Sequence, residues 1–458
     1  MSQNPKVIGY LPDERPSVWK LIIFALQQIV VMFPATVLVA LITGFHVSTT
    51  IFASGLATLS FILVTGGKIP LFYGSSFSYI TAIASVMAAE QALGSSLDQQ
   101  IAVAQFGIVM SGLVSIAAGL LIKRCGQKTI EKILPPTVTG SIAMVIGLSL
   151  AANAMSNAAS FPEVAVEQVA LAGNLAWVIA LVTLLSTVLF SVYLKGTWGQ
   201  VPILLGLLLG YVVALILGGI YGIPFVDFNK LSAQAVFTLP HFTLPKASWT
   251  AVLAIMPIAI ATIPESTAHL YQLDIYVNDL ARKKNAKKEY KIADKLGLNL
   301  IGDGIGDMIA GFIGGPAGTN YGENLSTMAI TKVFSIPVLV IAAVFTMILA
   351  CFTPLANAMY SIPSPVIGGI SIYLFGVIAA QGVTIMISKK VDMFDSRNLA
   401  VIAIIMIIGL GGSFGFEGGM IPVFGSKIPA IATAAIAGIL INLLLNIGKK
   451  KIEQDQPQ

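Results

Sequence analysis

A short glycine-rich break interrupts the hydrophobic second half of this chain and reads Gly314-Gly315-Pro316-Ala317-Gly318-Thr319-Asn320-Tyr321-Gly322. A helix-like run follows, and its first acidic residue is Glu323. Where the surroundings are apolar, non-helical backbone must be buried in protein or line a cavity, because its N–H and C=O groups otherwise lack partners. The break therefore marks a departure from a simple bundle of helices, and its acid needs a reason to be there.

The composition of the whole chain is that of an integral membrane protein. Of its 458 residues, 56% are hydrophobic and 10% are charged, whereas soluble domains carry about 25% charged residues. Apolar stretches recur from near the start to near the end, which leaves no room for a sizeable soluble domain. The first 19 residues are polar and lack the layout of a cleaved signal peptide, so the first span is expected to remain in the mature chain.

Windows of about 20 residues predict an all-α protein with fourteen membrane-spanning segments. They are Leu21–Thr43, Thr50–Thr65, Phe77–Ala89, Ile101–Ile122, Pro136–Ala152, Leu171–Tyr193, Val201–Leu217, Trp249–Leu273, Leu296–Ile313, Gly322–Val333, Ile336–Ala356, Val366–Ile387, Leu399–Gly412 and Ile428–Ile447. An even count puts both termini on one side of the membrane. With that side inside, all of the 26 Lys and Arg residues except Lys230, Lys246 and Lys427 are cytoplasmic, which is the asymmetry expected of a cytoplasmic-membrane protein with both termini in the cytoplasm.

The third and tenth segments are too short to span as simple helices, and they hold matching places in the two halves of the chain. Each follows an extended stretch, residues 69–76 in the first half and 314–322 in the second. Paired broken segments predict inverted repeats with a binding site near the membrane midplane. The expected organisation is a cytoplasmic tail (1–19), a first seven-segment repeat (20–218), an extracellular connection (219–248), a second repeat (249–447) and a cytoplasmic tail (448–458).

The two half-helices supply candidate binding groups, since the first N–H groups of a helix are unpaired and carry partial positive charge. The backbone N–H groups at Phe77 and at Gly322 or Glu323 are therefore predicted to bind carbonyl oxygens of a substrate. An unpaired charge at membrane depth costs about 3 kcal/mol on insertion scales, so Glu323 is the first functional candidate. The alternative is an acid that only complements its own helix N-terminus.

Glu265 and His269 form the second candidate constellation, in the eighth segment. Their spacing of four puts both on one helix face, where the imidazole and the carboxylate can interact and relay a proton. The alternative is a polar pair that satisfies itself in a packed bundle. Pro264, which precedes the pair, is expected to distort the helix locally.

Asp303 and Asp307 lie four apart in the ninth segment, where like charges repel, so either one is protonated or each has its own partner. We expect a role in helix positioning or conformation for them rather than substrate contact. Cys125 and Cys351 have no metal-ligand or disulfide spacing, and neither a metal site nor a cofactor is predicted. No nucleotide-binding loop is present in the sequence, which argues against an ATP-driven pump.

The run Tyr321-Gly322-Glu323-Asn324-Leu325-Ser326-Thr327-Met328-Ala329-Ile330-Thr331-Lys332 resembles the signature of the nucleobase–ascorbate transporter (nucleobase:cation symporter-2) family. Its acid and the preceding Tyr-Gly are similar to those of the bacterial uracil permeases. Glu265 and His269 fall where those permeases carry Glu and His, and residues 74–77 resemble the stretch before their third helix. The resemblance covers nearly the entire chain.

This resemblance implies proton-coupled uptake of uracil or a related nucleobase by elevator-like motion. A core domain (20–123 with 249–356) would hold the substrate, and a gate domain (136–218 with 363–447) would form a homodimer within the lipid membrane. The implied substrate-binding residues are Glu265, Glu323, Phe77, Gly322, Tyr321 and Ser76; those for proton coupling are His269, Glu265 and Glu323; and the conformational or structural polar residues are Asp303, Asn324 and Thr331. No nucleic-acid partner and no catalytic residue are implied.

Three positions depart from the family pattern and leave the choice of base open. Ser326 stands where the signature has Gly, Gln28 replaces a His of the first helix, and Phe375 stands where uracil permeases place a Tyr; Asp307 has no recognised counterpart. A xanthine or purine permease of the same family and an anion carrier of the related seven-plus-seven fold remain alternatives. A membrane-embedded enzyme would need a nucleophile or cofactor constellation that the sequence lacks.

Overall fold

The computed structural model describes residues 9–125, 133–196, 198–228, 235–423 and 426–447. The expected C-terminal tail, the first part of the N-terminal tail and some of the basic residues used for the topology, Lys230 among them, lie outside these residues.

The described chain is helical apart from two short sheets. Its first half contains α1 (Val18–Thr43), α2 (Val47–Val64), β1 (Tyr73–Ser75), η1 (Phe77–Tyr79), α3 (Ile80–Ala92), α4 (Leu97–Cys125), α6 (Pro136–Ser149), α7 (Ala151–Ala159), η2 (Val166–Gln168), α8 (Val169–Tyr193), η3 (Trp198–Gln200) and α9 (Pro202–Tyr221). Its second half contains α10 (Trp249–Ile255), α11 (Ile258–Lys283), η5 (Ala293–Lys295), α12 (Leu296–Ile313), β2 (Gly318–Asn320), α13 (Gly322–Thr331), α14 (Ile336–Ala350), α15 (Thr353–Tyr360), α16 (Ser364–Ser388), α17 (Ser396–Met406), η6 (Ile407–Gly411), α18 (Gly412–Gly415), η7 (Glu417–Gly419), β3 (Met420–Val423), β4 (Ser426–Pro429) and α19 (Ala430–Asn446).

Every segment expected from the sequence contains at least one of these helices, and the predicted all-α class is confirmed. Within the described residues, ten helices or helix pairs are long and apolar enough to cross a membrane, and Ile336–Ala350 and Ala430–Asn446 are shorter apolar helices. The total of fourteen spans stays a prediction. The eighth segment breaks between α10 and α11, at Pro257, while α11 continues through Pro264. Pro257 directly precedes the first residue of α11, where a proline removes no helical hydrogen bond.

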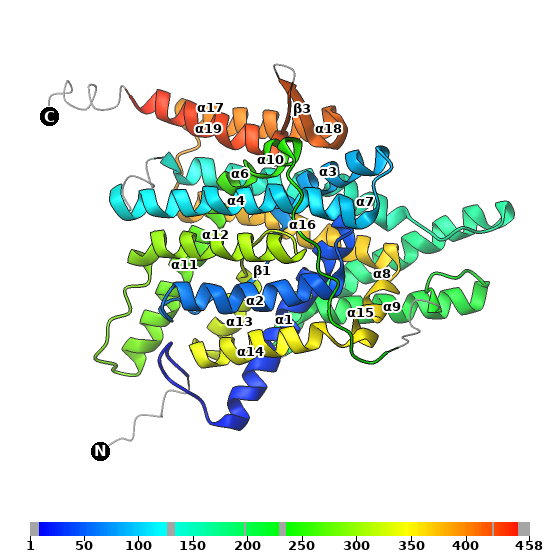
Figure 1. The fold of residues 1–458 in the computed structure, drawn as a ribbon, viewed down its shortest axis with the longest axis horizontal. Coiled ribbons are helices and arrows are strands. Elements are labelled where there is room, and N and C mark those ends of the chain that lie inside the picture. Colours follow the sequence, from blue (N-terminus) through cyan, green and yellow to red (C-terminus); the bar gives the residue numbers. More distant parts are fainter. Residues whose placement is uncertain (1–8, 126–132, 197, 229–234, 424–425, 448–458) are drawn as a thin grey trace.

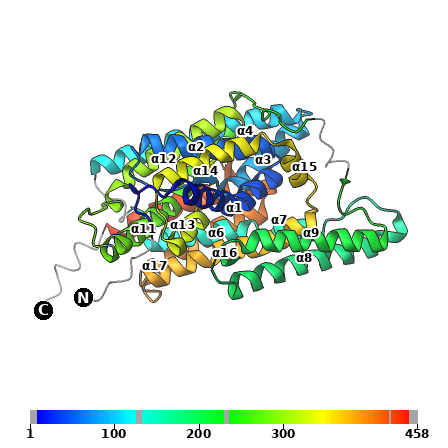
Figure 2. The same cartoon turned by 90° about the horizontal axis from the view of Figure 1, so that it is seen from below.

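The helices form two groups, which Figure 2 shows as an upper and a lower set. In one group, α12 packs against α4 and α2, and α14 packs against α2 and α1; in the other, α16 packs against α6, α7 and α8. The α2–α14 contact pairs the expected second and eleventh segments, and the α12–α4 contact pairs the ninth and fourth. In the predicted repeat, the second segment corresponds to the ninth and the fourth to the eleventh. The two contacts are therefore equivalent under the repeat, which supports it.

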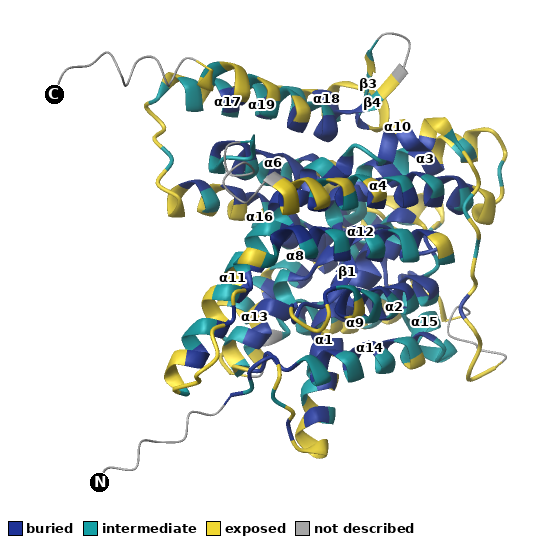
Figure 3. Cartoon of the chain, turned by 60° about the vertical axis from the view of Figure 1, so that its left-hand side comes forward, coloured by how far each residue is buried: buried dark blue, intermediate teal, exposed yellow. Residues whose placement is uncertain are grey.

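Small residues allow the closest of these contacts. A Cβ added at Gly112 of α4 or at Gly304 of α12 would collide with the backbone carbonyl oxygen of the other glycine, so the two helices touch backbone to backbone there. Figure 3 shows buried residues concentrated around β1 and α12, in the middle of the molecule, and exposed ones along α17 and α19 at one edge. The region around β1 is therefore the interior in which a site has to be sought.

Candidate functional site

The two extended stretches, which the sequence analysis places before the third and tenth segments, meet in the structure. Strand β1 pairs antiparallel with β2 in the register Tyr73↔Asn320, Gly74↔Thr319 and Ser75↔Gly318. Further backbone bonds extend the pairing at both ends, from Ser76 N–H to the carbonyl of Ala317 (3.0 Å) and from Tyr321 N–H to that of Phe72 (2.9 Å). Because the strands are antiparallel, the helices that follow them leave in opposite directions, with both N-terminal ends beside this sheet.

The two aspartates of α12 hold this sheet from behind. Asp307 Oδ1 accepts hydrogen bonds from the hydroxyl of Tyr73 on β1 (2.5 Å) and from the N–H of Gly318 on β2 (2.8 Å). Asp303 accepts from Asn320 Nδ2 (2.8 Å) and from the hydroxyl of Ser266 on α11. Each buried acid thus has its own partners, which is one of the two arrangements that the spacing allowed. Their contacts connect α11, α12 and both strands.

A cavity of about 470 Å³ lies in front of the sheet. It brings together all the residues predicted to bind substrate or to couple protons: Ser76, Phe77, Glu265, His269, Tyr321, Gly322 and Glu323. They come from three separate parts of the chain, namely η1 and its preceding residue, α11, and the start of α13. Neither aspartate of α12 is among the lining residues. A volume of this size holds a small planar ring with water beside it.

The two cavity carboxylates stand at different places relative to the helix starts. Glu265 projects from α11, and Ser78 of η1 donates a hydroxyl hydrogen bond to its Oε2 (3.5 Å). Glu323 lies in the first turn of α13, where the unpaired N–H groups favour a negative charge. The cavity therefore has acceptor carboxylates beside N–H donors, a combination that suits a ligand carrying both donors and acceptors.

His269 does not pair with Glu265, although the two share a helix face. Its Nδ1 is buried with no hydrogen-bond partner among the described residues. A Cβ added at Gly322 would lie 2.8 Å from His269 Nε2. The imidazole thus packs on Gly322, the first residue of α13, because glycine has no side chain. It contacts this residue and not the Glu265 carboxylate four residues earlier.

Several polar residues predicted for the site hold the scaffold. The hydroxyl of Tyr321 donates to the carbonyl of Ser75 (3.0 Å) and lies 2.9 Å from that of Thr36 on α1. Asn324 Nδ2 donates to the backbone carbonyl and the side-chain oxygen of Gln28, at 2.9 and 2.8 Å. Thr331 bonds to a carbonyl of its own helix, that of Thr327 (2.8 Å). Tyr321 and Asn324 therefore join the broken segments to α1.

Two side chains at the start of the first half-helix, Ser76 and Phe77, make contacts that hold it in place. Ser76 caps it, since its hydroxyl oxygen accepts from the N–H of Ser78 at 3.3 Å. Phe77 contacts Phe375 of α16 edge to face, with ring centroids 5.9 Å apart and an interplanar angle of 72°. Phe375 itself is buried behind its neighbours Tyr373 and Leu374, which line the cavity.

One wall of the cavity consists of residues that were not predicted from the sequence. Tyr373, Val377, Gln381 and Ile385 of α16 line it at a spacing of four residues, together with Ser388. The available signal was the group of polar residues in and just after the twelfth segment that line the cavity, namely Tyr373, Gln381, Thr384 and Ser388. The hydroxyl of Thr319, a further lining residue, is also buried without a partner in the described part of the chain. Buried polar groups are rarely left unpaired, so the walls offer bonding capacity to a polar ligand.

Comparisons with known proteins agree with this architecture and this site. A sequence model of the Permease family, that of the xanthine and uracil permeases, matches residues 19–418. The chain is 36% identical to the uracil permease of Bacillus caldolyticus, over 94% of both chains. It is 34% identical to the putative pyrimidine permease RutG of Escherichia coli (strain K12), over 98% of this chain and 94% of that one, and 33% identical to the uracil permease of Bacillus subtilis (strain 168), over 98% of both.

Two solved structures share the fold at low sequence identity. The transmembrane domain of a cyanobacterial bicarbonate transporter, BicA, aligns with a TM-score of 0.59 and 16% identity, covering 94% of this chain and 99% of that one. The murine anion transporter Slc26a9 in its inward-facing state aligns with a TM-score of 0.65 and 12% identity, covering 95% and 69%. The chain therefore belongs to the xanthine/uracil permease family, the nucleobase:cation symporter-2 group that its motif resembles, and is a multi-pass membrane transport protein and not an enzyme.

Proposed function

We propose that this protein takes up uracil, or a closely related nucleobase, across the cytoplasmic membrane together with protons. The observation that carries the proposal is the pair Glu265 and Glu323, which face one cavity beside two helix N-termini. Uracil presents alternating N–H donors and C=O acceptors on a small planar ring. Named uracil permeases among the relatives, at 33–36% identity over nearly the full length, favour this substrate.

In the proposed pose, Glu265 and Glu323 accept hydrogen bonds from the two ring N–H groups. The backbone N–H groups at Phe77 and Gly322 donate to the ring carbonyls, and the Phe77 ring packs against the base. A base analogue that lacks one N–H would leave a buried carboxylate unpaired, so discrimination between analogues is expected to be steep. An anionic substrate is not favoured, because two carboxylates line the same cavity.

For coupling, we propose that the inward proton is carried by the cavity residues His269, Glu265 and Glu323. His269 is suited to this role because its ring contacts the start of α13, the helix that carries Glu323. A change in its charge is therefore felt at the substrate-binding helix end. Its Nδ1 is buried and has no hydrogen-bond partner among the described residues, so one ring nitrogen is left with unused bonding capacity.

For transport, we propose elevator-like motion of a core (20–123 with 249–356) against a gate (136–218 with 363–447) that forms a homodimer. The separate packing of α4, α12, α2 and α14 on one side, and of α6, α7, α8 and α16 on the other, supports two bodies. Helices α8 and α9 expose apolar faces to lipid or to a second copy: Leu181, Leu185, Leu189, Leu208, Val212 and Ile216. We further propose that both termini are cytoplasmic, which the charge asymmetry favours.

The test is uptake into proteoliposomes of radiolabelled uracil, xanthine, hypoxanthine, urate and sulfate, with and without an inward proton gradient. Uracil uptake that rises with the gradient is expected, and Glu323→Gln should abolish it. Glu289→Gln is the matched control, since the Glu289 side chain is 76% exposed and lies outside the cavity. Full uptake and affinity in Glu323→Gln would refute the proposed site. Preference for a purine or for sulfate in the panel would reassign the substrate.

A further inference from the structure

Two of the three histidines in the chain meet one carboxylate at a place remote from the cavity. His46 Nε2 lies 3.1 Å from Asp98 Oδ1, and His241 Nε2 lies 2.9 Å from Asp98 Oδ2. The imidazole rings contact each other edge to face, with centroids 4.8 Å apart. One ligand atom from each of the three residues lies within 4.8 Å of the other two.

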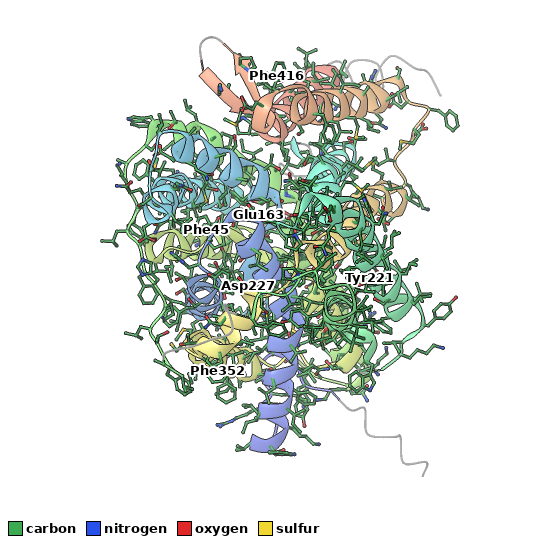
Figure 4. All side chains as sticks on the ribbon, turned by 90° about the vertical axis from the view of Figure 1, so that its right-hand side faces the viewer. Phe45, Glu163, Tyr221, Asp227, Phe352 and Phe416 are labelled. Carbon is green, nitrogen blue, oxygen red and sulfur yellow. The ribbon has the colours of Figure 1, made fainter. Side chains whose placement is uncertain are left out.

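The three residues come from parts of the chain that are far apart in sequence. His46 precedes α2, Asp98 lies in the first turn of α4, and His241 belongs to the extended residues 235–248 that lead to α10, which we call the strap. Figure 1 shows the strap as the green trace that passes α15 and reaches α10. Figure 4 shows the right-hand side of Figure 1 and labels Phe45, the residue before His46. It also labels Phe352, which forms a β-bridge with strap residue Phe237.

The donor set of the cluster is that of a small-cation site. Imidazole nitrogen and carboxylate oxygen bind Zn²⁺ at about 2.0–2.2 Å, which places two ligand atoms of a tetrahedral site about 3.3 Å apart. The two nitrogen–oxygen separations, 3.1 and 2.9 Å, are those of hydrogen bonds and need to lengthen by only about 0.2–0.4 Å to reach that value. The side chains of His46, Asp98 and His241 are 23%, 51% and 58% exposed, so an ion can reach them from solvent. Three protein ligands leave one position for water.

The surrounding contacts hold the ligands in place independently of an ion. Thr49 donates its hydroxyl to the backbone carbonyl of His241 (2.7 Å), and Thr243 and Gln105 exchange hydrogen bonds at 2.8 Å. The N–H of Lys246 donates to the carbonyl of Ala102 (2.8 Å). Before His241, the N–H of Thr238 donates to the carbonyl of Cys351 (3.0 Å). The strap is therefore fixed on both sides of His241, and ligands on supported backbone bind metal with less loss of freedom.

We propose that His46, Asp98 and His241 form a binding site for a divalent transition-metal cation, with Zn²⁺ as the best-fitting ion. Bound metal joins the strap to the start of α4 and to the turn between α1 and α2. Its effect is to stabilise this end of the helix group that carries the cavity acids. The proposal is independent of the proposed transport function, because none of the three residues lines the cavity.

The test uses full-length protein in detergent, purified without a histidine tag and freed of metal with a chelator. Titration with ZnCl₂ alone in a calorimeter should give one site per chain, and Zn²⁺ should raise the Tm. Bound Co²⁺ should show the visible absorption of a low-coordinate site. His241→Ala and Asp98→Asn should each weaken Zn²⁺ binding at least about 100-fold, since even residues that only support a metal ligand contribute 10–100-fold.

His269→Ala is the matched control, because it removes the one histidine outside the cluster and should leave Zn²⁺ binding unchanged. If Asp98→Asn fails to fold, His241→Ala decides, because its exposed side chain lies on a strap that other contacts hold. Absence of Zn²⁺ binding in the wild-type protein would overturn the proposal. Equal Zn²⁺ affinity in the wild-type protein and His241→Ala would also overturn it.

Discussion

Replacing Gly322 by alanine tests whether the start of α13 binds substrate. The backbone at this position does not have a positive φ, so alanine fits the local conformation. Its methyl group, however, would lie 2.8 Å from His269 Nε2. His269 Nε2 is the far end of a side chain that lines the cavity, so the collision is relieved by a turn of the ring, a shift of the helix start, or both. The substitution therefore pushes the helix start and the histidine apart.

The size of this displacement sets the expected loss of affinity. The two groups must separate by about 0.6 Å to reach an ordinary contact of 3.4 Å. Where the helix start takes up the whole shift, a hydrogen bond from the Gly322 N–H to a substrate carbonyl, ideal near 2.9 Å, is stretched to about 3.5 Å and largely lost. One such bond contributes about 0.5–1.5 kcal/mol, so the Kd for uracil should rise by up to about 10-fold.

The assay is equilibrium binding of radiolabelled uracil to protein in detergent, arranged as a double-mutant cycle. Gly322→Ala, His269→Ala and the double variant are compared, with Gly219→Ala as control because a Cβ there meets nothing within 4 Å. The double variant should bind better than the two single losses predict, since removing the ring relieves the collision. An unchanged Kd in Gly322→Ala would refute the reasoning, and strictly additive losses would show that the contact with His269 is not its cause.

Three further predictions concern the scaffold. Tyr73→Phe removes one of the donors to Asp307 and should lower the free energy of unfolding by about 1–3 kcal/mol; a wild-type Tm in detergent would contradict it. Gly304→Val forces α12 away from α4 and should cause a larger drop in Tm, whereas equal stability would show that the helices can separate freely. Partial burial raises the pKa of the Asp13 carboxyl, but hydrogen bonds from Lys288 and a neighbouring tyrosine outweigh this and hold the pKa below its usual value. The contribution of Asp13 to stability is thus present above about pH 4 and lost as the pH falls below it, so limited proteolysis near the N-terminus should increase on acidification in the wild type; an equal increase in Asp13→Asn would exclude this carboxyl.

The sequence was most informative where local composition is unusual. Two Gly- and Ser-containing breaks in apolar segments predict the two extended stretches, and the acids beside them predict the cavity lining, because broken backbone and charge are both rare in membranes. That the stretches pair as strands was not predicted. The helix interruption at Pro257 was not predicted, since both prolines fit the same apolar run and only a local distortion at Pro264 was expected. Which proline ends a helix depends on whether the freed backbone finds partners nearby.

Contacts across long sequence distances could not be predicted from spacing. Asp307 has two partners, Tyr73 and Gly318, which lie on two different strands. No periodicity in the sequence relates these two residues to each other. The same holds for the cluster of His46, Asp98 and His241. These residues are too far apart in sequence for the spacing patterns that identify metal sites. In both cases the residues become neighbours only after the two halves of the chain have packed together.

The four acids near the sheet divide into two pairs with different tasks. A pair of three-residue strands is too short to be stable alone, so the position of the two helix starts depends on what holds the strands. Asp303 and Asp307 supply that hold from α12, with all their observed partners in the protein. Glu265 and Glu323 face the cavity with few protein partners. Removing an acid of the α12 pair should therefore lower stability and substrate binding together, whereas removing one of the cavity pair should abolish binding and leave the Tm nearly unchanged.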